Sequence, residues 1–258
     1  MRHKRELALL GCLIAGTLCA PLVAQASDIV SMELTNAGPG NLGGVYTSPY
    51  EGVIGPAGIT SQSGFTSSNS QLVAIYCDDF ATHVSIGDIW QAVVTQLSTL
   101  QGQSTPDQTL KFDTAPGDAT KQEDDYMAAA LLAEQIAGIN ESSQQAELLS
   151  YALWGIFDNS ALDALGSHTG YDYETADQYM QSALNTAGSD TPDEFSNVYI
   201  YTPYNPTQPN DGKGDSQEYL VIVPKTVPEP GTFALFAAGL MGLGVLLRRR
   251  RVLTAAVS

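Results

Sequence analysis

The segment AIYCDDFATHVSIGDIW, residues 74–90, is central to the predicted fold because it joins two apolar stretches through a polar turn. The stretches, at 72–80 and 89–97, have the β-branched and aromatic residues typical of buried strands. Residues 85–88, Ser-Ile-Gly-Asp, have the composition of a turn. The pattern therefore predicts a β-hairpin whose first strand carries Cys77.

Further short strands are predicted on both sides of this segment. Their residues are rich in β-branched and aromatic side chains and are bounded by Gly, Pro, Asn and Ser. They lie at 29–34, 44–54, 197–202 and 217–223. The polar stretch 101–120 contains two prolines, so we expect it to be a surface loop.

A helical block is predicted between the two groups of strands. Capping boxes begin at Thr120, Ser142 and Thr175, and Gly138 and Gly188 mark two helix ends. The middle helix is apolar around most of its circumference, which predicts burial. Strands, then helices, then strands indicate an α+β fold: an antiparallel, β-rich domain with an inserted three-helix block.

The N-terminal 26 residues have the organisation of a signal peptide. Basic residues occupy the first positions, and an apolar run follows at 7–23. Ala24-Gln25-Ala26 then matches the small-x-small pattern of a signal-peptidase site. We therefore expect signal peptidase to remove residues 1–26 and the remainder to be exported.

A second apolar segment lies near the C-terminus. Residues 232–247 contain no charged side chain and would span roughly 24 Å as a helix at ~1.5 Å per residue. The bilayer core is ~30 Å thick, and a helix that starts near Pro230 and is followed by snorkelling arginines closes much of the difference. The basic cluster that orients this transmembrane helix consists of Arg248, Arg249, Arg250 and Arg251. It places the preceding residues outside the membrane.

The C-terminal pattern resembles the PEP-CTERM sorting signal of bacteria. The motif Pro228-Glu229-Pro230 precedes the apolar helix, and the four arginines follow it. The resemblance implies that a membrane-embedded exosortase cuts near this motif and passes the protein towards the cell envelope or extracellular matrix. The predicted organisation is thus a signal peptide (1–26), an exported domain (27–226) and a sorting signal (227–251).

The exported domain is strongly acidic. Residues 27–226 contain 26 acidic side chains against four lysines and no arginine, a formal charge of −22. Such a charge repels nucleic acid, so we expect no nucleic-acid partner. The acidic stretch 210–215 does not fit an EF-hand, because Ile222 occupies the position of the bidentate glutamate. We expect a solvated turn there, and no metal or cofactor.

Cys77 is the single cysteine left after removal of the signal peptide, so no internal disulfide can form. An enzyme would need Cys77 as a nucleophile with His83 or His168 as its base, but the spacing does not select this arrangement. Cysteine more often packs as a small buried hydrophobe. We therefore predict no catalytic residue and no enzymatic activity, and treat a reactive Cys77 thiol as the less favoured reading.

Two elements of the domain are similar to the thioester domains of bacterial adhesins, in which a strand cysteine bonds to the glutamine of a Thr-Gln-x-Ala-aliphatic-Trp helix. Here Cys77 matches the cysteine and Ala152-Leu153-Trp154 matches the helix. Leu149 and Ser150 stand where threonine and glutamine belong, and Ser150 has no carboxamide. The resemblance implies a related fold without the bond, unless a different register brings in the glutamines at 144–145.

The domain also resembles a PEP-CTERM group whose last strand is Gln-Glu-aromatic, here Gln217-Glu218-Tyr219. We therefore expect a non-enzymatic protein of the cell envelope or of a biofilm matrix. Its expected partners are signal peptidase, exosortase, exopolysaccharide or other matrix components, and the inner membrane before processing. The alternative is a surface adhesin that captures amines through an internal Cys-Gln thioester.

Overall fold

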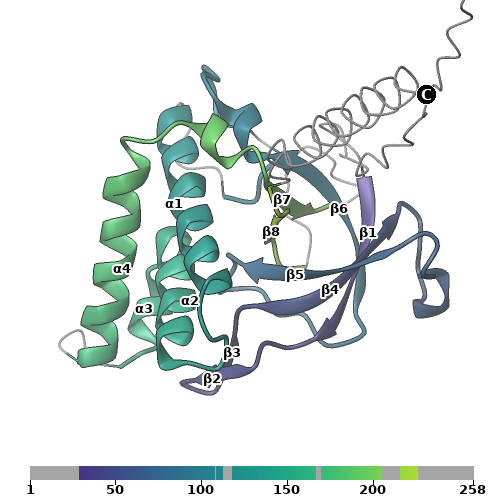
Figure 1. Ribbon diagram of the computed structural model, residues 1–258, viewed down its shortest axis with the longest axis horizontal. Coiled ribbons are helices and arrows are strands. Elements are labelled where there is room, and N and C mark those ends of the chain that lie inside the picture. The colour runs from purple at the N-terminus through teal and green to yellow at the C-terminus, as the bar shows by residue number, and fades with distance from the viewer. Residues whose placement is uncertain (1–28, 108, 113–117, 167–169, 205–215, 226–258) are drawn as a thin grey trace, which may run out of the picture.

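The computed structural model describes residues 29–107, 109–112, 118–166, 170–204 and 216–225. These residues form two layers, with helices beside a β-barrel (Figure 1). The predicted signal peptide, the sorting signal with its apolar segment 232–247, His168 and the acidic stretch 210–215 lie outside the described residues. Within the described part of the chain, no helix combines the length and apolarity needed to cross a bilayer.

The barrel has six strands, and every neighbouring pair is antiparallel. The strands are β1 (Ile29–Asn36), β4 (Tyr50–Pro56), β5 (Gln71–Cys77), β6 (Ile89–Gln96), β7 (Val198–Pro203) and β8 (Tyr219–Ile222). They close in the order β1-β4-β5-β8-β7-β6. The remaining strands, β2 (Gly40–Leu42) and β3 (Val45–Thr47), form a separate ribbon, so the predicted strand at 44–54 is divided in two.

The predicted hairpin of β5 and β6 is wrong. β5 pairs with β4 and β8, whereas β6 pairs with β1 and β7. The stretch between them is longer than a tight turn, and its beginning follows β8 instead: the Asp78 amide N–H donates to the Glu218 carbonyl oxygen over 3.4 Å. β5 and β6, which are neighbours in the sequence, thus lie on opposite sides of the barrel. In a closed sheet both edges of β5 can form hydrogen bonds with other strands, so β6 is not needed beside it.

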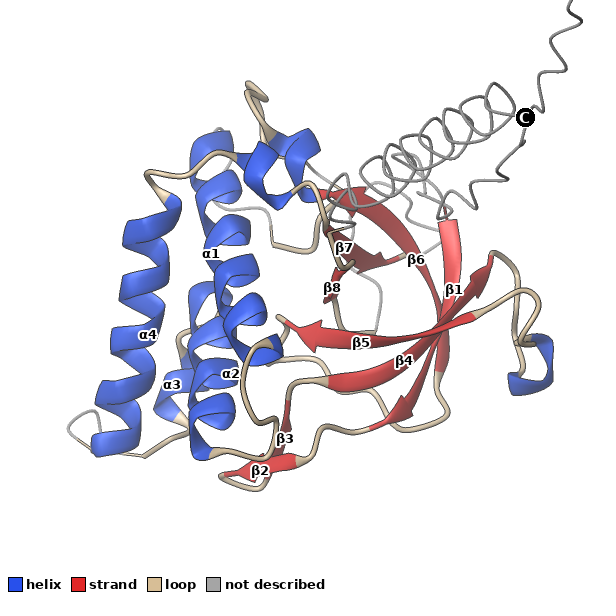
Figure 2. Ribbon diagram, viewed as in Figure 1, coloured by secondary structure: helices blue, strands red, loops and turns tan. Residues whose placement is uncertain are grey.

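The helical block lies between β6 and β7 in the chain, as predicted. Its helices lie together beside the barrel (Figure 2). The block contains four α-helices among the described residues where three were expected. They are α1 (Ala119–Ala137), α2 (Gln144–Phe157), the short α3 (Ser160–Asp163) and α4 (Tyr171–Ala187). Short 3₁₀-helices lie at Gln62–Gly64, Leu97–Leu100 and Pro192–Phe195.

The predicted helix ends are more accurate than the predicted starts. Gly138 and Gly188 cap α1 and α4, as expected. Side chains of Asp118 and Ser143, rather than Thr120 and Ser142, accept the first backbone N–H groups of α1 and α2. α4 begins after Gly170, one turn before the predicted Thr175. The capping-box pattern therefore found each helix but displaced its first residue.

The burial predicted for the middle helix is confirmed. All residues of α2 from Leu148 to Gly155 are buried, and α2 packs against α1 and α4. Trp154 is 1% exposed and lies 5.4 Å from the ring of Phe80, which follows β5. The Tyr151 hydroxyl donates to the Leu42 carbonyl oxygen over 2.7 Å. α2 thus joins the helical layer to the barrel and to the β2–β3 ribbon.

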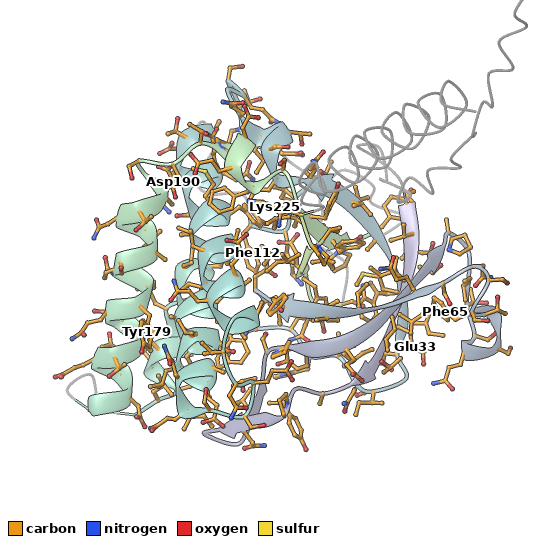
Figure 3. The ribbon with its side chains drawn as sticks, in the orientation of Figure 1. Glu33, Phe65, Phe112, Tyr179, Asp190 and Lys225 are labelled. Atoms are coloured by element: carbon orange, nitrogen blue, oxygen red, sulfur yellow. The ribbon has the colours of Figure 1, made fainter. Side chains whose placement is uncertain are left out.

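The prediction of a surface loop at 101–120 is wrong for the stretch that contains Leu110 and Phe112. Leu110 is 1% exposed, and the ring of Phe112 stacks on Phe157 at 4.5 Å. Figure 3 shows Phe112 between the helices and the strands. Apolar residues on both sides of Lys111 hold this segment in the interlayer core, where it positions the lysine for the contacts described below.

Candidate functional site

Cys77 ends β5 in the interlayer core and is 0% exposed. Its amide N–H donates to Ser48 Oγ over 3.2 Å, and its thiol donates to the Asp79 carbonyl oxygen over 3.2 Å. Burial, followed by the nearby carboxyl groups of Asp78 and Asp79, raises the pKa of the Cys77 thiol well above its usual range. The thiol therefore remains protonated at neutral pH, and a protonated thiol is a weak nucleophile.

Ser150 faces this strand from α2, with Ser48 between them. The Ser48 amide N–H donates to Ser150 Oγ over 3.1 Å, and Ser150 Oγ donates to the Ala146 carbonyl oxygen over 3.0 Å. Ser150 thus lies one side chain away from Cys77 but offers no carboxamide. Gln144, considered as a substitute, instead donates to Asp172 on α4 over 3.0 Å.

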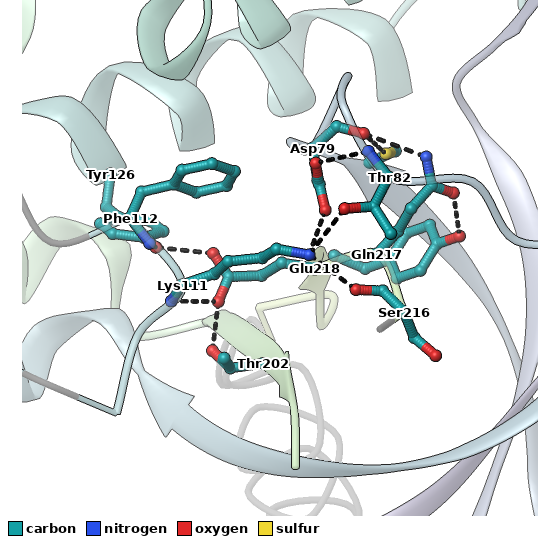
Figure 4. A network of polar contacts seen from close by, with 11 residues as sticks. Asp79, Thr82, Lys111, Phe112, Tyr126, Thr202, Ser216, Gln217 and Glu218 are labelled. Carbon is teal, nitrogen blue, oxygen red and sulfur yellow. Dashed lines mark hydrogen bonds and ion pairs between the residues drawn. The ribbon is translucent and has the colours of Figure 1, made fainter. Parts of the chain in front are cut away.

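A different glutamine approaches Cys77. Gln217 Nε2 donates over 3.0 Å to the same Asp79 carbonyl oxygen that accepts the Cys77 thiol (Figure 4). The Tyr219 hydroxyl donates to Gln217 Oε1 over 2.8 Å. Sequence reasoning considered glutamines of the helix and missed this one. The available indication was the position of Gln217 beside the last strand, in the Gln-Glu-aromatic motif.

Lys111 and Asp79 form a buried ion pair. Lys111 Nζ lies 2.5 Å from Asp79 Oδ2, and the two side chains are 12% and 1% exposed. The same ammonium donates to Thr82 Oγ1 over 3.0 Å and to the Ser216 carbonyl oxygen over 2.7 Å. All three N–H groups of the lysine therefore have acceptors. Sequence analysis missed Lys111 because it lies in a stretch with the composition of a loop.

Lys111 and Asp79 belong to a buried polar cluster, and Glu218 is the centre of its other half. The side chain of Glu218 is 0% exposed. Its carboxylate accepts the Tyr126 hydroxyl of α1 over 2.6 Å, the Lys111 backbone N–H over 3.0 Å and the Thr202 hydroxyl of β7. Figure 4 shows these donors converging from separate segments. One carboxylate thus joins α1, β7 and the segment that carries Lys111.

Asp78 places a second buried carboxyl group beside Glu218. Asp78 is 0% exposed, its carboxyl group contacts that of Glu218, and no hydrogen-bond donor of the described residues reaches its oxygens. Burial, and then the neighbouring charge of Glu218, raises the pKa of Asp78 well above its ordinary value. Because Glu218 already accepts three hydrogen bonds as a carboxylate, we expect Asp78 to be the protonated member of the pair.

The cluster does not assemble the nucleophile and base of an enzyme among the residues described. His83 is exposed, whereas Cys77, Asp78 and Glu218 are completely buried. Asp78 and Asp79 are engaged with Glu218 and Lys111 respectively. In the same part of the chain, no group of three or more His, Cys, Asp or Glu side chains is arranged to hold a metal ion. The arrangement favours cross-linking of the layers by polar contacts.

Replacing Lys111 tests the strength of the buried ion pair. Lys111→Met leaves the Asp79 carboxylate buried without its cation, so we expect the free energy of unfolding to fall by about 3–5 kcal/mol. Urea denaturation followed by circular dichroism measures the change. The control is Lys225→Met, because Lys225 is exposed and its ammonium donates to one acceptor within the described residues, the Glu194 carbonyl oxygen. A loss no larger for Lys111→Met than for this control would contradict the proposed role of the ion pair.

Replacing Asp78 tests whether its buried carboxyl group is protonated. An acid whose folded-state pKa is raised loses stability as pH rises from its unfolded pKa, near 3.8, to its folded pKa. Asp78→Asn removes this loss while retaining a donor towards Glu218. The unfolding constant of the wild type should therefore increase relative to that of Asp78→Asn by up to about tenfold per pH unit as the pH rises from 3.8 towards the raised pKa of the folded state.

Denaturation of both proteins across this pH range measures the difference, and Asp193→Asn is the control because Asp193 is exposed. If the stability difference between wild type and Asp78→Asn does not change with pH, Asp78 does not hold the proton.

Comparison with known protein families matches one motif to this chain, the PEP-CTERM protein-sorting motif at residues 226–251. Comparison with curated proteins and with solved structures gives no match. The match begins one residue before the predicted sorting signal and ends at the same arginine, so that prediction is confirmed. Residues 226–251 thus carry a PEP-CTERM protein-sorting motif, which supports sorting of the protein by exosortase and its export to the cell envelope or extracellular space.

Proposed function

We propose that this protein is a non-enzymatic component of the cell envelope or extracellular matrix, held briefly in the inner membrane by its C-terminal segment and then released by exosortase. The sorting motif at 226–251 carries the proposal. The burial of Cys77, Asp78 and Glu218 supports a structural role, because catalytic groups must contact their substrate.

The negative charge of the domain indicates which class of matrix polymer it can bind. The domain 27–226 has a formal charge of −22, so it repels anionic polymers at low and moderate salt. A neutral or cationic exopolysaccharide is therefore the better partner. The protein would associate with such a polymer through its surface and would not modify it.

Fractionation of an exosortase-containing strain tests this proposal. The mature protein should lack residues 232–251 and should be found in the envelope or matrix fraction. Changing Pro228, Glu229 and Pro230 together to alanine should leave the uncleaved protein in the inner membrane, because the strip that exosortase recognises is lost. Mass spectrometry and immunoblotting of the fractions measure both results.

Asp193→Asn, which changes an exposed acid outside the motif, should be processed normally. In a strain that makes no exopolysaccharide, the mature protein should move from the matrix to the medium. A mature protein that retains residues 232–251, or one found in the cytosol, would refute the proposal.

A second candidate function is a thioester adhesin, and the contacts of Gln217 favour it. The Cys77 thiol and the Gln217 amide donate to the same carbonyl oxygen, and the Tyr219 hydroxyl donates to the Gln217 carbonyl oxygen. In the reaction, Cys77 Sγ would bond to Gln217 Cδ, the C–N bond would break, and ammonia would leave with the thiol proton. The hydroxyl of Tyr219 would stabilise the developing oxyanion.

Intact mass distinguishes the two candidates. The non-enzymatic proposal predicts that the exported protein has the full mass of its sequence after processing. A thioester predicts a mass lower by one ammonia, restored by Cys77→Ser and by Gln217→Glu but not by Gln144→Glu. Observation of that deficit, with this dependence on both residues, would replace the first proposal by the second.

A further inference from the structure

An open groove of about 530 Å³ lies on the outside of the barrel, beside the β2–β3 ribbon. It is formed by β4 and β5 together with the segments that follow β1, precede β6 and join α1 to α2. It does not include Cys77, Lys111 or Glu218, so it is separate from the buried polar cluster.

Exposed apolar side chains gather in this groove. Four large hydrophobic residues of the described chain are exposed, and three of them line it: Tyr46, Leu72 and Ile86, at 55%, 61% and 60%. The backbone at Tyr46 is fixed, because the Tyr50 hydroxyl donates to the Tyr46 carbonyl oxygen over 2.5 Å. Three such side chains on one concave surface are typical of a binding site, whereas scattered ones need no explanation.

The polar side chains of the groove include negatively charged carboxylates and a neutral amide. Asn36, Glu51 and Ala74 are paired across β1, β4 and β5, so they form a row on one face of the sheet, with a small side chain at its end. Glu141 adds a second exposed carboxylate. None of the lining residues is basic, and neither glutamate forms an ion pair with the described part of the chain.

We propose that this groove binds a cationic polysaccharide, a chain of sugars that carry free amino groups. The apolar C–H face of a pyranose ring can stack on the exposed ring of Tyr46, whose π-face is electron-rich. The ammonium groups can pair with Glu51 and Glu141, and the Asn36 amide can bond to hydroxyls. The open shape of the groove admits a chain that continues at both ends. This inference rests on the proposed matrix role and specifies the class of polymer that the protein would bind in the matrix.

Titration of the exported protein with defined glycans tests the inference. The probes are a glucosamine hexamer, its neutral N-acetylated form and an anionic galacturonate hexamer. Isothermal titration calorimetry measures the binding of each. We expect the order of affinity to be cationic, then neutral, with no binding of the anionic chain. Tyr46→Ala should weaken binding by about five- to tenfold through loss of stacking, and Tyr46→Phe should retain it.

The double variant Glu51→Gln with Glu141→Gln should reduce the preference for the cationic over the neutral hexamer and the salt dependence of binding. Val223→Ala is the matched control, because Val223 is the exposed large hydrophobic residue outside the groove. The altered side chains are exposed, and thermal melting confirms that each variant is folded.

Absence of binding to the glucosamine hexamer, equal binding of the galacturonate hexamer or an unchanged affinity of Tyr46→Ala would each overturn the inference. Binding of a lysine-rich peptide in place of the glycan would overturn it as well. These results are distinguishable from failure of the proposed function: a protein that still fractionates with the matrix but binds no glycan in this groove contradicts the groove alone, whereas one absent from the matrix contradicts the matrix role.

Discussion

The arrangement of the two layers depends on the hydrogen bonds that the buried carboxylate of Glu218 accepts. Its three donors come from α1, from β7 and from the segment at Lys111, which are distant in the sequence. Burial of a carboxylate is unfavourable unless hydrogen bonds replace its hydration, so the fold is stable only when all these elements are in place. Lys111 completes the arrangement, because its side chain reaches the Asp79 end of the same cluster.

Local patterns in the sequence were sufficient to predict most of the elements, and insufficient to predict their partners. The apolar circumference of α2 identified a buried helix, and the β-branched and aromatic residues around Cys77 identified a strand. The order of the barrel depends on pairs such as Cys77 with Tyr219, which are formed between remote segments and leave no local pattern. The assumption that consecutive strands pair produced the incorrect hairpin.

The same limit applies to the candidate site. Cys77 and Ser150 were identified from the sequence, and the structure brings them together through Ser48. Lys111 was not identified, and Gln217 was noted only as part of the Gln-Glu-aromatic motif, because neither composition nor spacing distinguishes a lysine or glutamine that will be enclosed from one that remains solvated. Burial of these polar residues results from packing of the two layers around them, as the stacking of Phe112 on Phe157 illustrates.

The position of β8 at the end of the described chain affects when folding can finish. β8 ends at Ile222, and the sorting motif begins at residue 226, so the last barrel strand and the C-terminal segment emerge almost together during translocation from the N-terminus. Until then, β5 and β7 lack a common neighbour and the barrel remains open. Closure of the barrel must therefore wait until the chain has been made almost up to the sorting motif, so the whole domain stays incomplete until its last few residues are present.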